Sequence, residues 1–431
     1  MASNPFAAYA AVLRLPGAIA FSAAGFIARL SLGIVGIGTL LYISNTTNSY
    51  AYAGLLQALF ATTSAVAALF TSRLADKFGQ RAVLIPLPLI FAVSLVTFVF
   101  AVQVDTVRWV QMALIIIAGA SFPSFGSFVR ARWVYATWND TDSLRSAFAL
   151  ESIFDELVFA IGPLLAAFLA FNVGLPSPVL VAGALALIGG FALASLTRSI
   201  PPVHVDHSEQ SYSKNPLRHQ GLTLLVTASL GIGILFGSFD VAIVAFTKNT
   251  GMPELAGVTL ALWAVGSMIG GIIYGSRHLR MPLPRQVRFT SLAMVVIAIP
   301  MPFIANVNWL MLGAFLSGFA IAPTLISTFS LAERLVPAAL LTQGLTWVNS
   351  GLALGFAAGA SFGGILVDRF GTPEAFGLGV AGACLTLSVS VFAQGRWKAG
   401  SRNRPLPQPG LALNSDLIPG PAPSGFVDDP I

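Results

Sequence analysis

Long apolar runs separated by short polar segments are the dominant pattern along the chain. Twelve of these runs reach the length of about 20 residues that a helix needs to cross the hydrocarbon core of a bilayer. They lie at about 17–43, 51–72, 83–103, 108–129, 146–170, 178–197, 221–246, 255–276, 287–305, 309–331, 342–366 and 375–394. The pattern therefore predicts an all-α membrane protein with twelve transmembrane helices.

The polar segments predict how these spans are grouped. Short connections lie at 45–50, 73–81, 130–145 and 248–254. The longer break at 198–220 leaves six spans on each side. We expect an N-terminal six-helix bundle, a cytoplasmic linker, a C-terminal six-helix bundle and a disordered Pro-rich cytoplasmic tail, at 1–197, 198–220, 221–395 and 396–431.

Two pairs of segments indicate that the halves are repeats. Residues 160–178 align with 357–375, with small residues falling on small residues. Residues 118–128 resemble 317–329, and each segment places a proline shortly after a glycine. Two pseudo-symmetric six-helix halves with a substrate path between them are typical of secondary transporters.

Composition and charge agree with a multi-pass membrane protein. The 431 residues are 56% hydrophobic and 9% charged, whereas soluble domains carry about 25% charged residues. The basic residues are scattered singly and form no stacking platform, so we expect no nucleic-acid partner. The single cysteine, Cys384, excludes an intrachain disulfide framework.

The positions of Lys and Arg predict the orientation in the membrane. If the spans alternate, 19 basic residues fall on the side of the termini and the central linker, and three, Arg108, Lys248 and Arg369, fall on the other side. Because cytoplasmic loops carry the excess of Lys and Arg, both termini are expected to be cytoplasmic. The predicted location is the cell inner (plasma) membrane.

The connection between the second and third spans, SRLADKFGQRAVL, carries a family resemblance. It resembles the cytoplasmic loop signature of the major facilitator superfamily, G-x-L-A-D-[RK]-x-G-[RK]-[RK], with Ser72 and Gln80 departing from it. The resemblance implies the major facilitator fold, and it implies a loop that latches the two halves in the outward-facing state. The residues that would form this gating loop are Asp76, Lys77, Gly79 and Arg81.

The fifth span indicates a direction of transport. Gly162-Pro163 matches the Gly-Pro of the antiporter signature in this superfamily, which implies a kink of the kind found in bacterial proton-coupled efflux proteins. Ala166 and Ala167 stand where a glycine pair is usual, and Ile115 stands where drug exporters have an arginine. The resemblance therefore favours drug- or metabolite-exporter-like members and leaves the substrate open.

Three acidic residues interrupt the apolar run of the fifth span: Glu151, Asp155 and Glu156. A charged side chain at the bilayer centre costs about 2.5–3.5 kcal/mol on insertion scales. Counted from Ser146 at 1.5 Å per residue, Asp155 and Glu156 lie about 14–15 Å deep, near the midplane. Glu151 lies one turn shallower on the face of Asp155.

Arg29, in the first span, is the expected charge partner of these acids. It lies at a similar depth and could pair with Asp155 or Glu156, since the first and fifth spans are neighbours in this fold. A fixed ion pair that holds the first half together is the alternative role. One arginine cannot neutralise three acids, so we expect at least one carboxylate to exchange protons.

Asp240, in the seventh span, is the corresponding candidate in the second half. The four histidines all lie in predicted loops, so proton coupling falls to the carboxylates. The order of preference is Asp155, Asp240, Glu156 and Glu151, and Glu151 has the alternative role of an interfacial cap.

The fourth span, which lines the cavity in this superfamily, holds the candidate substrate contacts Phe122, Pro123 and Phe125. Packing against lipid or in the protein core is the alternative for the two aromatic rings.

These features favour proton-coupled efflux of a small organic molecule by alternating access. Proton-coupled uptake, and a membrane receptor or lipid-moving protein on the same fold, are the alternatives. No nucleotide-binding loop of the G-x-x-x-x-G-K-[ST] type and no nucleophile–base pair is visible, so we expect neither an ATP-driven pump nor an enzyme. The expected partners are a small-molecule substrate, protons and the lipid bilayer, with no cofactor and no metal, and the protein is expected to be monomeric.

Overall fold

The computed structural model describes residues 5–137, 140–201, 221–276, 281–336 and 341–397, and these are almost entirely helical. In chain order the first group is α1 (Pro5–Leu13), α2 (Ala18–Thr47), α3 (Tyr50–Phe78), α4 (Gln80–Leu84), α5 (Pro86–Gln103), α6 (Arg108–Ala120), α7 (Phe125–Ala136), α8 (Thr141–Asn172), α9 (Ser177–Ser195) and the 3-10 helix η1 (Thr197–Ser199). The second group is α10 (Leu222–Asn249), α11 (Leu255–Ser276), α12 (Leu283–Ala298), the 3-10 helix η3 (Met301–Phe303), α13 (Val307–Gly318), α14 (Ile321–Leu335), α15 (Leu341–Arg369) and α16 (Thr372–Phe392).

Twelve helical segments in the described ranges are long and apolar enough to cross a membrane, as the hydropathy pattern predicted. Four of them combine two consecutive elements: α4 with α5, α6 with α7, α12 with η3, and α13 with α14. The fourth and tenth spans are interrupted at the same relative place, near Pro123 and just before Pro323. These interruptions coincide with the repeated segments 118–128 and 317–329.

Two of the predicted polar connections are largely helical. Helix α3 continues to Phe78, so the predicted loop 73–81 contributes only Gly79 between α3 and α4. Helix α7 continues to Ala136 and α8 begins at Thr141, which shortens the predicted connection 130–145. The physical reason is that polar residues at the ends of long membrane helices stay helical beyond the apolar core. Most of the predicted linker and the predicted tail, 202–220 and 398–431, lie outside the described residues.

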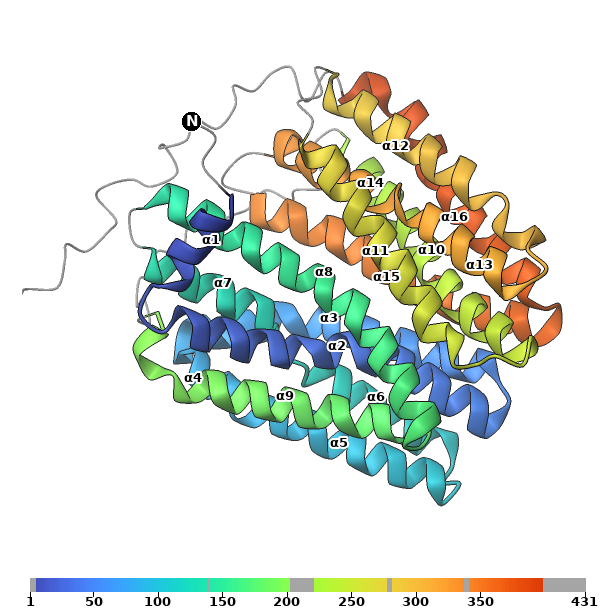
Figure 1. Ribbon diagram of the computed structural model, residues 1–431, viewed down its shortest axis with the longest axis horizontal. Helices are drawn as coiled ribbons and strands as arrows, with labels where there is room; N and C mark the ends of the chain where they lie inside the picture. Colours follow the sequence, from blue (N-terminus) through green and yellow to red (C-terminus); the bar gives the residue numbers. More distant parts are fainter. Residues whose placement is uncertain (1–4, 138–139, 202–220, 277–280, 337–340, 398–431) are drawn as a thin grey trace, which may run out of the picture.

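The helices pack in the same pattern in both groups (Figure 1). Helix α2 packs on α8 and α9, as α10 packs on α15 and α16, and α3 packs on α6 as α11 packs on α13. Two pairs provide most of the contact between the groups, α3 with α15 and α8 with α11, and α10 also touches α2 and α3. The helices alternate in direction, so we call the end where α2 begins and α16 ends the terminal face, and the other end the far face.

Small residues bring the two groups into backbone contact near the far face. A Cβ atom added to Gly54 of α3 would lie 2.1 Å from the carbonyl oxygen of Ala360 in α15. A Cβ atom added to Gly257 of α11 would lie 2.5 Å from the carbonyl oxygen of Pro163 in α8. Close approach through small residues is the usual way in which membrane helices associate, and both contacts lie within three turns of a far-face helix end.

Candidate functional site

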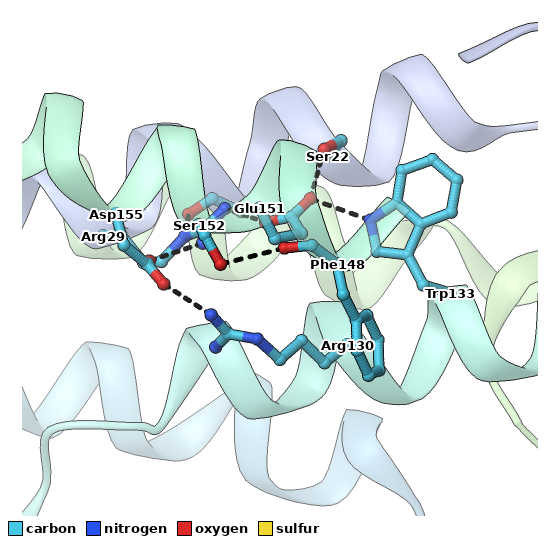
Figure 2. A network of polar contacts seen from close by, with 9 residues as sticks. Ser22, Arg29, Arg130, Trp133, Phe148, Glu151, Ser152 and Asp155 are labelled. Carbon is cyan, nitrogen blue, oxygen red and sulfur yellow. Dashed lines mark hydrogen bonds and ion pairs between the residues drawn. The ribbon is translucent and has the colours of Figure 1, made fainter. Parts of the chain in front are cut away.

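Arg29 forms the centre of a polar network in the first group of helices (Figure 2). The side chain is 5% exposed and donates to the carboxylates of two residues of α8. Nη1 bonds to Oδ1 of Asp155 at 2.7 Å, and Nη2 forms an ion pair with Oε2 of Glu151. Nε donates to the carbonyl oxygen of Gly25 one turn earlier in α2, at 3.1 Å, which fixes the direction of the guanidinium group.

Glu151 is fully buried and is bonded through both oxygens. Its Oε1 accepts hydrogen bonds from Oγ of Ser22 at 2.6 Å and from Nε1 of Trp133 at 2.8 Å, and its Oε2 binds Arg29. The ring of Phe21 packs edge-on against Trp133, 4.7 Å between centroids, and holds the indole in this direction. Glu151 is therefore an interior carboxylate with a closed set of partners, and its position does not fit the alternative of an interfacial cap.

Asp155 joins two arginines. Its Oδ1 accepts from Arg29, and its Oδ2 accepts from Nη2 of Arg130 in α7 at 2.5 Å. The side chains of Asp155 and Arg130 are 34% and 36% exposed, so this end of the network is more open than the end at Glu151. Charge-assisted hydrogen bonds of this length are among the stronger polar interactions in proteins.

Arg130 changes the charge count that the sequence predicted. We expected Arg29 to be the only basic residue at this depth, because the fourth span was drawn to end at residue 129. Since α7 continues to Ala136, Arg130 lies on the same helix and turns toward α8. Two arginines therefore face three acids, and in the described part of the chain Glu156 has neither a hydrogen bond nor an ion pair.

Asp240 lies in α10, in the second group of helices. Within the described ranges it forms no hydrogen bond and no ion pair, and its side chain is partly buried. The aromatic residues of the neighbouring turn, Phe236 and Phe239, pack against Trp263 of α11 with centroids 5.2 and 5.7 Å apart. No bond among the described residues fixes the Asp240 carboxylate, in contrast to Asp155, which is bound by two arginines.

Gln57 and Trp263 are among the buried polar side chains of the far-face half that lack partners within the described residues. Gln57 of α3 is 3% exposed, and neither its amide nitrogen nor its oxygen is hydrogen-bonded. Trp263 is 5% exposed, and its Nε1 is not hydrogen-bonded. Counted along their helices at 1.5 Å per residue, both lie about 10–12 Å from the far-face end. Sequence reasoning missed both, because a single Gln or Trp in an apolar run gives no signal of its direction.

Gly162 and Pro163 lie where α8 contacts two other helices. A Cβ atom added to Gly162 would lie 2.5 Å from the backbone of Gly33 in α2, so only glycine permits this approach. One residue later, the carbonyl of Pro163 faces Gly257 of α11 in the other group. The predicted antiporter-like kink therefore coincides with a joint between α2, α8 and α11.

Comparison with known proteins decides the family. The sequence matches the Major Facilitator Superfamily over residues 21–359. The chain belongs to this superfamily. No curated protein sequence matches it.

Solved structures of superfamily transporters share the fold at low sequence identity. The nucleoside transporter NupG is 14% identical, with a TM-score of 0.68 over 89% of this chain and 99% of that one. A peptide transporter of the POT family in complex with sulfate is 12% identical, with a TM-score of 0.68 over 90% of this chain and 95% of that one. A bacterial homologue of the iron transporter ferroportin in an inward-facing state is 15% identical, with a TM-score of 0.65 over 89% of this chain and all of that one. The protein is thus a multi-pass membrane transporter and not an enzyme.

The superfamily signature surrounds a sharp turn at Gly79. Gly79 has φ +84°, a backbone conformation that favours glycine. Lys77 and Arg81 are exposed, and the side chain of Asp76 lies outside the described residues. The gating roles of these four residues remain predictions.

Gln80, which replaces a basic residue of the signature, has a structural role. Its side-chain oxygen accepts from Nε of Arg132 at 2.9 Å, and its nitrogen donates to the carbonyl of Phe128 at 3.2 Å. Arg132 is fully buried and also donates to the carbonyls of Leu193 and Leu196, at the end of α9. A basic residue at position 80 would face the buried guanidinium group of Arg132. This like-charge contact explains why Gln80 replaces the basic residue of the signature.

The predicted substrate contacts lie in the interior of the first group of helices. Phe122 and Phe125 are 8% and 1% exposed, and Pro123 is also buried. The two rings pack edge-on, 5.6 Å between centroids, in a cluster that includes Phe60 and Phe91. The expectation that they line a cavity is not supported, because the interruption of the fourth span turns them toward α3 and α5. In the described ranges, no three His, Cys, Asp or Glu residues are grouped to hold a metal ion.

Proposed function

We propose that this transporter couples the export of a small organic molecule to the inward movement of protons, by alternating access between its two faces. The observation that carries the proposal is Asp240, an acidic residue in a membrane span with no partner among the described residues. A carboxylate in that position can take up a proton from one side and release it to the other. Each elementary charge that crosses contributes about 2.3 kcal/mol per 100 mV.

The ion-paired network of the first half changes the order of the candidate acids. Glu151 and Asp155 each bind arginine, and breaking such a pair leaves an uncompensated buried charge. We therefore assign the network a structural role in our proposal and place proton exchange at Asp240 first and at Glu156 second. Asp155 is third, because its side chain is a third exposed and can be reached by water.

Gln57 and Trp263 are our candidates for polar contacts with the substrate. Their unpartnered buried nitrogen and oxygen atoms require hydrogen bonds, and a bound polar molecule can supply them. The similar structures include transporters of nucleosides and of peptides, and both kinds of substrate carry amide or hydroxyl groups.

The proposal of export rather than uptake rests on Gly162-Pro163. We propose that the terminal face is on the cytoplasmic side of the inner membrane, which the excess of Lys and Arg on that side favours, and that the protein is a monomer.

The test is proton flux in everted membrane vesicles that contain the full chain. Uridine, dialanine and tetraphenylphosphonium serve as probes of three chemical classes, and a fluorescent pH dye reports proton movement under an imposed gradient. Export by antiport predicts probe-dependent proton release from the vesicles. Asp240→Asn should abolish it, whereas the exposed acid Glu374, changed to Gln, should leave it intact.

Three results would count against the proposal. Release that persists in Asp240→Asn and in Glu156→Gln would exclude these acids as the coupling groups. Probe-dependent proton movement in the reverse sense would replace export by uptake. Binding of a probe by thermal shift with no transmembrane flux would favour a receptor.

A further inference from the structure

Two charged residues of the second half hold the turn between α2 and α3 of the first half. Asp368, near the end of α15, accepts hydrogen bonds from the backbone nitrogens of Tyr50 and Ala51, both at 2.8 Å, and from Oγ of Ser49 at 3.0 Å. Lys248, near the end of α10, donates to the carbonyl oxygen of Ser44 at 2.9 Å and to Oδ1 of Asn48 at 3.2 Å. Its ammonium group also lies 5.8 Å from the centroid of the Tyr50 ring.

The signs of the two charges match the helix ends that they meet. Asp368 binds the first free N–H groups of α3, where the helix dipole is positive. Lys248 binds a carbonyl near the end of α2, where the dipole is negative. Each residue therefore satisfies backbone groups that the first half leaves open at its own turn.

These bonds exist only while α3 and α15 are in contact. A Cβ atom added to Gly364 would lie 2.2 Å from the carbonyl of Tyr50, so the backbones touch one turn before Asp368. Gly54 and Ala360 continue the same contact one turn further from the far face. Separation of the two helices at this face would break all three bonds to Asp368 at once.

Among the described residues, the equivalent seam between α8 and α11 has no charged side chain that bonds across it; Glu254 lies beside α8 there but forms no hydrogen bond or ion pair. In the repeat alignment Pro163 and Ala167 correspond to Ala360 and Gly364, and they contact Gly257 as their counterparts contact α3. The position that corresponds to Asp368 is Phe171. Asp368 is therefore not required by the symmetric packing of the fold.

The sequence around Asp368 repeats part of the signature at the end of α3. Residues 366–371 read LVDRFG, and residues 74–79 read LADKFG. Each copy ends a helix of the α3–α15 pair, and the two copies lie at opposite faces of the molecule. The copy in α15 supplies the carboxylate that caps the partner helix at the far face.

We infer that Asp368 and Lys248 form a latch that holds the far face closed, and that its release is a step in opening the transporter to that side. The inference rests on the alternating access of the proposed function. It assigns to the far face its own charged latch, separate from the signature loop of the terminal face.

The test measures the opening of the far face directly and needs no substrate. Spin labels on Val107→Cys and Phe303→Cys, which are exposed at the far face in the two halves, report the distance between the halves. Cys384, the single native cysteine, is changed to Ser, and the full chain is studied in lipid nanodiscs. Asp368→Asn and Lys248→Gln should each raise the ratio of long-distance to short-distance populations by at least about tenfold. Asp368→Glu, which keeps the charge, should recover part of the closed population.

Two matched controls separate the latch from a general effect of charge at this face. Glu374→Gln and Arg369→Gln remove one exposed charge of each sign near the end of α15, and among the described residues neither side chain forms a hydrogen bond or ion pair with the first half. Distances that are unchanged in both latch variants, or shifted equally in the controls, would overturn the latch. A single distance population in every variant and at every pH would instead overturn alternating access and with it the proposed function. Thermal unfolding in the same nanodiscs identifies any variant that has failed to fold.

Discussion

The interiors of the two halves treat charge in opposite ways. In the first half, Arg29 and Arg130 bind Glu151 and Asp155 in one connected network. In the second half, Asp240 lies beside aromatic residues with no bond among the described residues. Cations bound to both oxygens stabilise the charged form of a carboxylate. A carboxylate without partners destabilises the folded protein if it stays charged away from water. Acidic residues inside the membrane spans can therefore serve rigidity in one half and proton exchange in the other.

The repeat shows that the fold does not require an ion network at these positions. In the alignment of α8 with α15, the positions of Glu151 and Asp155 are occupied by Val348 and Leu352. Both helices pack on the first helix of their own group in the same way, through Gly162 on α2 and Gly359 on α10. Apolar residues thus fill the same place where the first half has a network of ions.

Removal of Arg29 should produce the largest change in stability. Arg29→Ala leaves the fully buried Glu151 without its cation, and such losses cost about 3–5 kcal/mol. Chemical denaturation in detergent micelles measures the free energy of unfolding. The exposed Arg14, changed to Ala, is the control and should change stability by less than about 0.5 kcal/mol. The double variant Arg29→Met with Glu151→Met should recover most of the loss, and a loss as large as that of Arg29→Ala would contradict the paired-charge account.

Addition of a charge to the first half should have the next largest effect. Gln80→Arg restores the basic residue of the family signature but places it against the buried Arg132. We expect a loss of about 2–3 kcal/mol, because one guanidinium group gives up a hydrogen bond and faces a like charge. Gln80→Met, which removes the bond without adding charge, is the matched comparison and should cost less. Equal losses of unfolding free energy in the two variants would show that the loss comes from the missing hydrogen bond and not from the added charge.

Replacement of Asp240 should have the smallest effect on stability. Asp240→Leu removes an acid that has no partner among the described residues, so the free energy of unfolding should stay within about 1 kcal/mol of the parent. The same variant should lose the dependence of transport on the proton gradient. A destabilisation comparable to that of Arg29→Ala would mean that Asp240 has a structural partner, and the contrast between the halves would fail.

Hydropathy was sufficient to predict the twelve spans, since a span needs about 20 apolar residues. The pairing of Arg29 with Asp155 or Glu156 was expected from their depth, which follows from the rise per residue, and from the superfamily resemblance, which makes the first and fifth spans neighbours. The structure shows the bond to Asp155. The bonds to Glu151 were not predictable to the same degree. They depend on Trp133, which lies beyond the predicted end of the fourth span and was assigned to a loop. The polar run that contains Arg130, Arg132 and Trp133 could have been considered as a continued helix.

The direction of side chains was the main source of error. Phe122 and Phe125 follow the interruption near Pro123, where the helix changes direction and periodicity no longer indicates a face. Contacts between distant segments were also outside the reach of local rules. Ser49 is visible as a helix cap in the sequence, but its bond to Asp368, 319 residues away, required the packing of α3 on α15.

Helix α3 connects the far-face turn to the signature without a break. Its 29 residues correspond to a rod of about 43 Å, with the turn held by Asp368 at one end and the LADKF segment at the other. A tilt of about 10° around the first end displaces the second by about 7 Å on this length. A movement of α3 at one membrane surface therefore moves its other end at the opposite surface. This coupling needs only one rigid helix and no chain of side-chain contacts through the core.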